Sequence, residues 1–156
     1  MKYIGFDLGS SSIKAAIIDA ESGALSGTCQ YPESEMAIDS PEPGFAEQNP
    51  SLWWENCQKV SRKLLAQTSI NPNEIKGIGI AYQMHGLVCL DKDGKVLRPS
   101  IIWCDSRAVS QGEAAFNTLG SNYCLSHLLN SPGNFTASKL RWIQENEPEI
   151  FSRIET

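Results

Sequence analysis

Two short apolar stretches at the start of the chain, joined by a turn of small residues, constrain the fold more than any other feature. Residues 3–8 (YIGFDL) and 13–18 (IKAAII) alternate like half-buried strands, and residues 9–12 (GSSS) lie between them. This pattern is typical of a β-hairpin. A further turn at residues 21–23 leads into a third apolar stretch, residues 24–31, so the chain should begin with an antiparallel meander.

The rest of the chain predicts helices interleaved with strands. Prolines and glycine in residues 32–49 predict a long loop, and Asn49 followed by Pro50 is a typical helix start. Strands are expected at residues 75–81, 87–90 and 99–103, the first of them buried, and helices at residues 50–67, 106–118, 121–129 and 136–146. In the first helix, the expected buried stripe is Leu52, Trp53, Trp54, Cys57, Val60 and Leu64. In the last helix, Thr136 is the expected cap, with Leu140 and Ile143 on the inner face. This order predicts an α/β domain.

Composition excludes several classes of protein. The 156 residues include 13 basic and 18 acidic side chains, so the net charge of −5 offers no footprint for nucleic acid or an anionic membrane. No apolar run reaches the roughly 18 residues of a membrane-spanning helix, and no signal sequence is apparent. The five cysteines are widely spaced, which favours reduced thiols in the cytoplasm over a disulfide framework or a zinc site.

Asp7 and the serine turn are the strongest candidates for chemistry. The chain has no Walker, Rossmann or EF-hand motif, but backbone N–H groups and hydroxyls at Ser10, Ser11 and Ser12 could surround phosphate oxygens. Asp7, inside an apolar strand, would repel that anion unless Mg²⁺ or its water shell lies between them, and Lys14 could add positive charge. The alternative is that Asp7 caps a turn and the serines are merely solvated.

Five blocks of sequence resemble the FGGY carbohydrate kinases, a branch of the actin-like ATPases. Residues 7–14 (DLGSSSIK) look like the first phosphate loop, and QMHG at 83–86 narrows the likeness to the N-terminal part of the xylulose kinases. The other blocks are GFAEQNP with the following WW, LRPSIIWCDSR and NFTASKL. The resemblance implies an actin-like, ribonuclease-H-like domain: a mixed sheet that begins with an antiparallel meander and is flanked by helices.

The resemblance also implies ligands and roles. ATP with Mg²⁺ is the expected cofactor, with Asp7 positioning the metal through water and with the nucleotide held by Gly9, Ser10, Ser11, Ser12 and Lys14. D-xylulose is the expected sugar, held by Met84, His85, Trp103 and Asp105. For His85 a plain turn residue is the alternative, for Trp103 a core residue, and for Asp105 an ion pair with Arg107. Trp53 and Trp54 are expected to serve packing.

Some questions stay open within this resemblance. The family's general base, second phosphate loop and adenosine pocket lie beyond residue 156, so residues 1–156 are expected to be an incomplete N-terminal FGGY domain that lacks the C-terminal domain and is inactive alone. A cytoplasmic enzyme is expected, and a homodimer is one assembly it could form. Alternatives are an FGGY kinase for ribulose, gluconate or glycerol, and a non-catalytic sugar-binding module.

Overall fold

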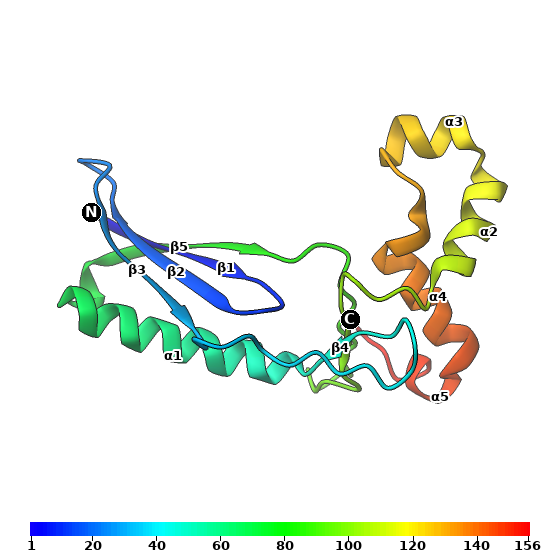
Figure 1. Ribbon diagram of the computed structural model, residues 1–156, viewed down its shortest axis with the longest axis horizontal. Coiled ribbons are helices and arrows are strands. Elements are labelled where there is room, and N and C mark those ends of the chain that lie inside the picture. The colour runs from blue at the N-terminus through cyan, green and yellow to red at the C-terminus, as the bar shows by residue number, and fades with distance from the viewer. The chain divides into compact units, whose positions relative to one another are not determined.

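The computed structural model describes all 156 residues and divides the chain into two compact units (Figure 1). Unit 1 comprises residues 1–37 and 51–83, and unit 2 comprises residues 38–50 and 84–156. The chain therefore passes between the units three times. Each unit has its own hydrophobic cluster and is described by itself.

Unit 1 contains a four-stranded mixed sheet. Its strands are β1 (Lys2–Leu8), β2 (Ile13–Asp19), β3 (Leu25–Tyr31) and β5 (Ile75–Tyr82), in the order β3-β2-β1-β5. The first three pair antiparallel, whereas β5 runs parallel to β1. The predicted meander and the predicted α/β class are therefore confirmed.

Helix α1 (Pro50–Thr68) supplies the side chains that cover one face of this sheet (Figure 1). Side chains alternate between the faces of a strand, so Ile13 and Ile17 of β2 point to the helix side and are fully buried. From α1, Val60 and Leu64 are one helical turn apart and meet them in the same cluster. This cluster is the core of unit 1.

Strand β5 departs from the prediction of a buried strand. It pairs only with β1, and its side chains Ile78, Ile80 and Tyr82 are 67%, 62% and 73% exposed. An open hollow of about 420 Å³ lies between β5 and α1, and Trp54 on its rim is 66% exposed. The prediction that Trp54 belongs to the buried stripe and serves packing is therefore wrong, because α1 turns this side chain toward the hollow instead of the core.

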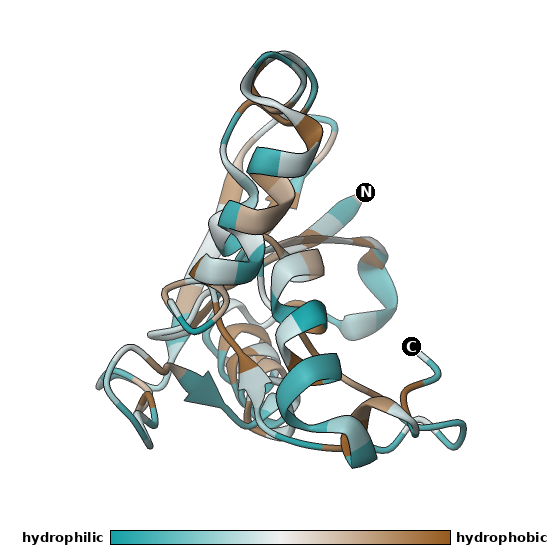
Figure 2. Ribbon diagram, turned by 90° about the vertical axis from the view of Figure 1, so that its right-hand side faces the viewer, coloured by the Kyte–Doolittle hydropathy of each residue, from teal (hydrophilic) through white to brown (hydrophobic).

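Unit 2 combines short helices with a two-stranded sheet. The sheet pairs β4 (Glu47–Gln48) with β6 (Ser100–Ile101). The helices are α2 (Val109–Leu119), α3 (Ser121–Tyr123), α4 (Thr136–Asn146) and α5 (Pro148–Phe151), with a π-helical turn at Cys124–Leu128 and a 3₁₀ turn at Pro132–Asn134. Another 3₁₀ turn, Pro72–Glu74, precedes β5 in unit 1. Hydrophobic and hydrophilic residues alternate around the helices of unit 2 (Figure 2).

Glycine permits the closest packing within unit 2. A Cβ atom added to Gly112 of α2 would lie 2.2 Å from the Cα of Gly133 in the 3₁₀ turn. No side chain fits at that distance. The pair of glycines therefore brings α2 against the segment that leads into α4.

Some predicted elements of unit 2 are shorter than expected. Residues 87–90 form only isolated bridges, Leu87 with Ile101 and Leu90 with Val96, and the strand expected at 99–103 is reduced to β6. Thr136 begins α4 and does not cap it with its side chain; its hydroxyl donates instead to the Gly86 carbonyl (3.1 Å). None of the helices combines the length and the apolar character needed to cross a membrane.

Truncation of single side chains should distinguish buried from exposed sites in unit 1 by the loss of unfolding free energy. We expect Leu64→Ala, at a fully buried site, to lower the unfolding free energy by about 2–5 kcal/mol. Ile80→Ala, at an exposed site of β5, should cost less than about 1 kcal/mol. Urea unfolding with matched slopes measures both, and equal losses would contradict the assignment of the core.

Candidate functional site

The turn between β1 and β2 leaves polar groups available for a ligand. The Gly9 N–H donates to the Ser12 carbonyl (3.2 Å), and the Ser11 carbonyl accepts from the Met36 N–H (2.8 Å). These two bonds fix the turn. The N–H groups and hydroxyls of Ser11 and Ser12 have no partner in the protein, so they can donate to an anion.

Asp7 and Lys14 lie opposite each other in the β1–β2 register. The alternation of β1 directs Phe6 and Leu8 toward α1, which leaves Asp7 on the other face, exposed. Asp7 therefore lies inside an apolar strand, as predicted, but its side chain is exposed and not buried. Neither Asp7 nor Lys14 forms a hydrogen bond or ion pair within the chain, so both charges remain available to a ligand.

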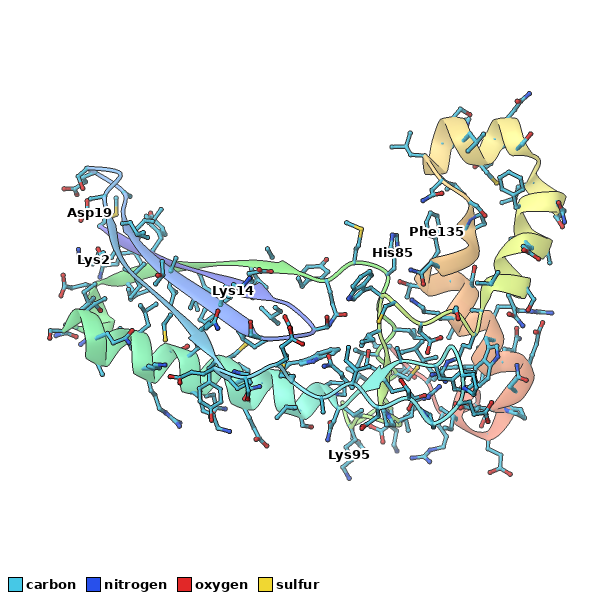
Figure 3. The ribbon with its side chains drawn as sticks, in the orientation of Figure 1. Lys2, Lys14, Asp19, His85, Lys95 and Phe135 are labelled. Carbon is cyan, nitrogen blue, oxygen red and sulfur yellow. The ribbon has the colours of Figure 1, made fainter.

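Two open hollows meet at Lys14, which is labelled in Figure 3. One, of about 600 Å³, is bordered by Asp7, Lys14 and Gln30 on the open face of the sheet. The other, of about 290 Å³, is bordered by the serine turn, Lys14, Glu33 and Glu35. Lys63 neutralises Glu33 at 2.9 Å and lowers the pKa of that carboxyl. Asp7 and the groups predicted to hold phosphate thus lie within one unit and face adjoining spaces.

The Met84–His85 turn lies in unit 2. Met84 is 68% exposed, and His85 has a φ of +63°, in the left-handed region that non-glycine residues rarely occupy. The imidazole of His85 stacks on the ring of Phe135, with 5.0 Å between the centroids and 11° between the planes (Figure 3). The turn therefore presents a flexible thioether and an oriented imidazole.

Trp103 is half exposed, at 48%. Its carbonyl accepts a hydrogen bond from the Asn134 side-chain amide. This exposure contradicts the alternative of a core tryptophan. It leaves an indole face in unit 2 that a ligand could contact.

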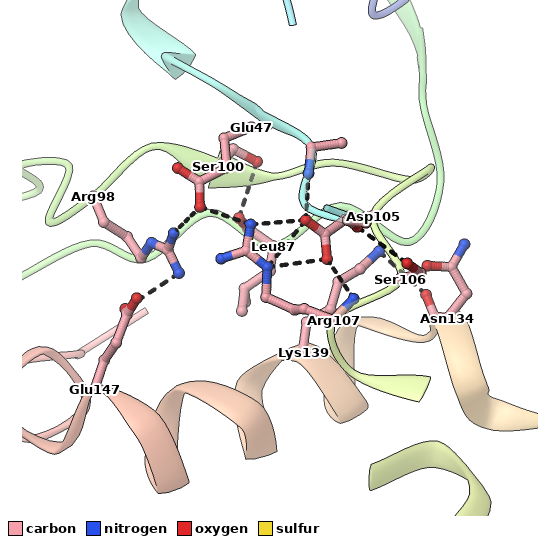
Figure 4. A network of polar contacts seen from close by, with 12 residues as sticks. Glu47, Leu87, Arg98, Ser100, Asp105, Ser106, Arg107, Asn134, Lys139 and Glu147 are labelled. Carbon is pink, nitrogen blue, oxygen red and sulfur yellow. Dashed lines mark hydrogen bonds and ion pairs between the residues drawn. The ribbon is translucent and has the colours of Figure 1, made fainter. Parts of the chain in front are cut away.

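Asp105 lies in a buried ion-pair network (Figure 4). Its carboxylate accepts from the Ala46 N–H (2.6 Å), from the Arg107 N–H (2.9 Å) and from the Arg107 guanidinium (2.7 Å). The two side chains are 0% and 1% exposed. Of the two roles left open for Asp105, the geometry supports the ion pair with Arg107, and no oxygen of the carboxylate is directed to a ligand.

Arg107 connects this network to the loop of residues 38–50. It pairs with Glu47 at 2.7 Å and stacks 3.8 Å from the centre of the Phe45 ring. Burial opposes the charge of Arg107, but hydrogen bonds to Asp105 and Glu47 leave its pKa raised. Arg98 also pairs with Glu47 and reaches Glu147 at 3.2 Å. The network is therefore a structural clamp within unit 2.

Lys139 of α4 is the site residue that sequence reasoning missed. Its side chain is fully buried and donates to the carbonyls of His85 (2.7 Å) and Asn134 (3.3 Å). Burial lowers the pKa of this ammonium to about 8, against the attraction of Asp105. One signal was present in the sequence: Lys139 precedes Leu140 and lies one turn before Ile143, on the inner face of the helix.

A family model decides the affiliation of the chain. The N-terminal domain of the FGGY family of carbohydrate kinases matches residues 2–156. The chain belongs to the FGGY family. The mixed sheet with its flanking helices is the fold of this FGGY N-terminal domain.

Several relatives of this FGGY chain bear the name xylulose kinase. It is 34% identical over 153 residues to the xylulose kinase of Escherichia coli (strain K12), covering 98% of this chain and 30% of the relative. It is 38% identical to a probable L-xylulose kinase of Haemophilus influenzae, covering 99% and 31%. The crystal structure of a "xyloylose kinase" from Brucella ovis matches with a TM-score of 0.87 and 35% identity, covering 100% of this chain and 32% of that one. The chain thus spans about 30% of the curated relatives' length.

Substitution of Asp105 should test its structural role. We expect Asp105→Asn to lower the unfolding free energy by about 3 kcal/mol, because it removes one of the two carboxylates that pair with the buried Arg107 and leaves only Glu47. Asp93→Asn, in an exposed turn, is the matched control and should change it by less than about 0.5 kcal/mol. Denaturant unfolding measures both, and a folded, fully stable Asp105→Asn chain would return Asp105 to the candidate ligands.

The pKa of Lys139 predicts a pH dependence of stability. Its folded value of about 8 lies below the ordinary 10.5, so between these pH values the unfolded chain binds more protons. The unfolding free energy relative to Lys139→Met should therefore rise with pH from about 8 to 10.5, by at most about 1.4 kcal/mol per pH unit. Unfolding of both chains across pH 7–10.5 measures the difference, and the comparison cancels the titration of other groups. A difference that stays flat or falls would contradict the assignment.

Proposed function

We propose that this chain is the N-terminal part of an ATP-dependent kinase that phosphorylates D-xylulose to D-xylulose 5-phosphate. One observation carries the proposal: in a chain of the FGGY family, Asp7 and Lys14 face each other beside the serine turn without any partner in the protein. The names of the relatives support xylulose as the sugar.

Phosphoryl transfer depends on alignment and on neutralisation of charge more than on covalent chemistry by the protein. Mg²⁺-ATP would supply the phosphoryl group when bound. Asp7 is the acceptor for the metal or its water shell, because carboxylate oxygens are preferred Mg²⁺ ligands. The N–H groups and hydroxyls of Ser11 and Ser12 hold phosphate oxygens, with Gly9 and Ser10 shaping the turn, and Lys14 balances the negative charge.

The sugar is held by unit 2 in this proposal. The imidazole of His85, fixed by the Phe135 ring, exchanges a hydrogen bond with a sugar hydroxyl. Met84 packs against the carbon chain, and the half-exposed indole of Trp103 offers an apolar face. Asp105 supports this site through the Arg107 clamp and does not contact the sugar.

Residues 1–156 form an incomplete N-terminal domain in this proposal, since they span about 30% of the relatives. The general base, the second phosphate loop and the adenosine pocket would come from the remaining portion. The fragment alone transfers no phosphate. The free cysteines are consistent with a cytoplasmic enzyme.

L-xylulose is the second candidate substrate. The relative at 38% identity is named a probable L-xylulose kinase, and the D-sugar relative is 34% identical. The two sugars differ in the configuration of their hydroxyls. Assay of the intact kinase against both, with ribulose, gluconate and glycerol alongside, decides the sugar, and binding without turnover of any of them would favour a sugar-binding module.

Substitution of His85 should affect the sugar and not the nucleotide. We expect His85→Ala in the intact kinase to lower kcat/KM for the ketose by about 1–3 kcal/mol, the cost of an unpaired polar partner, with the KM for ATP unchanged. Steady-state kinetics with each substrate varied in turn measures this. His127→Ala is the control, because His127 is exposed on the π-helical turn. Unchanged kcat/KM in His85→Ala would remove His85 from the sugar site.

Substitution of Asp7 should affect phosphoryl transfer. We expect Asp7→Asn in the intact kinase to lower kcat by about 10²-fold or more, because the Mg²⁺ that would neutralise the transition-state charge loses its carboxylate acceptor. The unfolding free energy should stay within about 0.5 kcal/mol at this exposed position. A Mg²⁺ titration at fixed ATP measures whether the metal requirement rises. Wild-type kcat and metal dependence would contradict the proposed role of Asp7.

A further inference from the structure

Lys139 is the only lysine of the chain whose side chain is fully buried. An ammonium group loses its hydration on burial and is retained only where it is paired or hydrogen-bonded. Lys139 meets that condition through two backbone carbonyls, those of His85 at 2.7 Å and Asn134 at 3.3 Å. Neither acceptor belongs to the helix that carries the lysine.

The acceptor at His85 is the notable one, because this residue has an unfavourable backbone conformation. A non-glycine residue at φ +63° costs about 1–3 kcal/mol and persists only when its surroundings fix it. Three contacts converge on the turn from the segment 135–139. Lys139 binds the His85 carbonyl, the Phe135 ring stacks on the imidazole, and the Thr136 hydroxyl donates to the Gly86 carbonyl (3.1 Å).

The neighbouring carboxylate of Asp105 does not explain why the ammonium group of Lys139 is buried. Asp105 attracts the ammonium, but the oxygens of Asp105 are already satisfied by Arg107 and the Ala46 N–H. Arg107 also limits the attraction, since its own positive charge lies beside the same carboxylate. The hydrogen bonds of the ammonium go to two backbone carbonyls, and the shorter one goes to His85 in the turn.

We propose that Lys139 is a positioning residue, which holds the Met84–His85 turn in its left-handed conformation from the first turn of α4. The consequence for the sugar rests on the proposed function: when Lys139 is lost, the imidazole no longer points where a sugar hydroxyl can meet it. The positioning itself is a property of the chain and does not depend on the substrate.

The test for positioning uses the 156-residue chain and the variant Lys139→Met, which keeps the length of the side chain and removes its donors. Arg141→Met, on the exposed side of the same helix, is the matched control. We expect the Cα chemical shift and the HN–Hα coupling of His85 to leave the left-handed range. Exchange of the Leu87 amide, which follows the turn and donates to the Ile101 carbonyl (2.9 Å), should accelerate about tenfold, the equivalent of one lost hydrogen bond, in Lys139→Met only.

Two measurements guard against a variant that does not fold. Lys139→Gln keeps one donor group and should give an intermediate change at His85. In the unaltered chain, a ¹⁵N spectrum of the lysine ammonium groups should contain one signal with slow proton exchange, which is absent from Lys139→Gln. A folded Lys139→Met with an unchanged His85, or an unaltered chain without a protected ammonium, would overturn the inference.

Kinetics of the intact kinase separates this inference from the proposed function. If both the positioning role of Lys139 and the sugar role of His85 hold, Lys139→Met should raise the KM for the ketose about tenfold, as expected for one lost hydrogen bond. The KM for ATP should be unchanged. A shifted His85 conformation with unchanged sugar kinetics in both Lys139→Met and His85→Ala would support the positioning role and refute the sugar role of His85. An equal loss for sugar and ATP, together with an unchanged His85 conformation, would show a merely structural lysine and overturn the inference.

Discussion

The alternation of side chains along β1 decides which of its residues form the core and which remain available to a ligand. Ile4, Phe6 and Leu8 point toward α1 and build the core of unit 1, so Asp7 must point to the opposite face. The antiparallel pairing with β2 then brings Lys14 opposite Asp7. A shift of one residue in this register would bury the carboxylate and expose the core. The candidate nucleotide site therefore depends on the same pleat that makes the sheet stable.

In unit 2, buried charged side chains hold the candidate site in place. Asp105 and Arg107 fasten the loop of residues 38–50, and Lys139 fastens the turn at His85. Buried ion pairs add little net stability, but removal of one partner is costly because the other charge stays behind. Such groups therefore fix one arrangement of irregular segments. Unit 2 needs this, since its only sheet is two residues long on each strand.

Local patterns predicted the regular elements well and the exposure of their residues less well. The meander, α1 and α4 follow from periodicity, and their ranges differ from the predicted ones by few residues. Trp54 and strand β5 were expected to be buried because apolar side chains favour burial. Burial also requires a packed neighbouring element, and β5 is an edge strand that pairs only with β1. Threonine is a common helix cap, but the hydroxyl of Thr136 donates a hydrogen bond to the Gly86 carbonyl, which is distant in the sequence.

Periodicity and motifs of adjacent residues were enough to predict the hairpin, the α/β class, the FGGY resemblance and the candidacy of Asp7, the serine turn and His85. Packing between distant segments settled two further points: the Ala46 N–H binds the Asp105 carboxylate beside Arg107, and Lys139 reaches the carbonyl of His85. Those contacts join residues 59 and 54 positions apart in the chain. Pairing over such distances is set by how the segments pack, and no local pattern of residues encodes it.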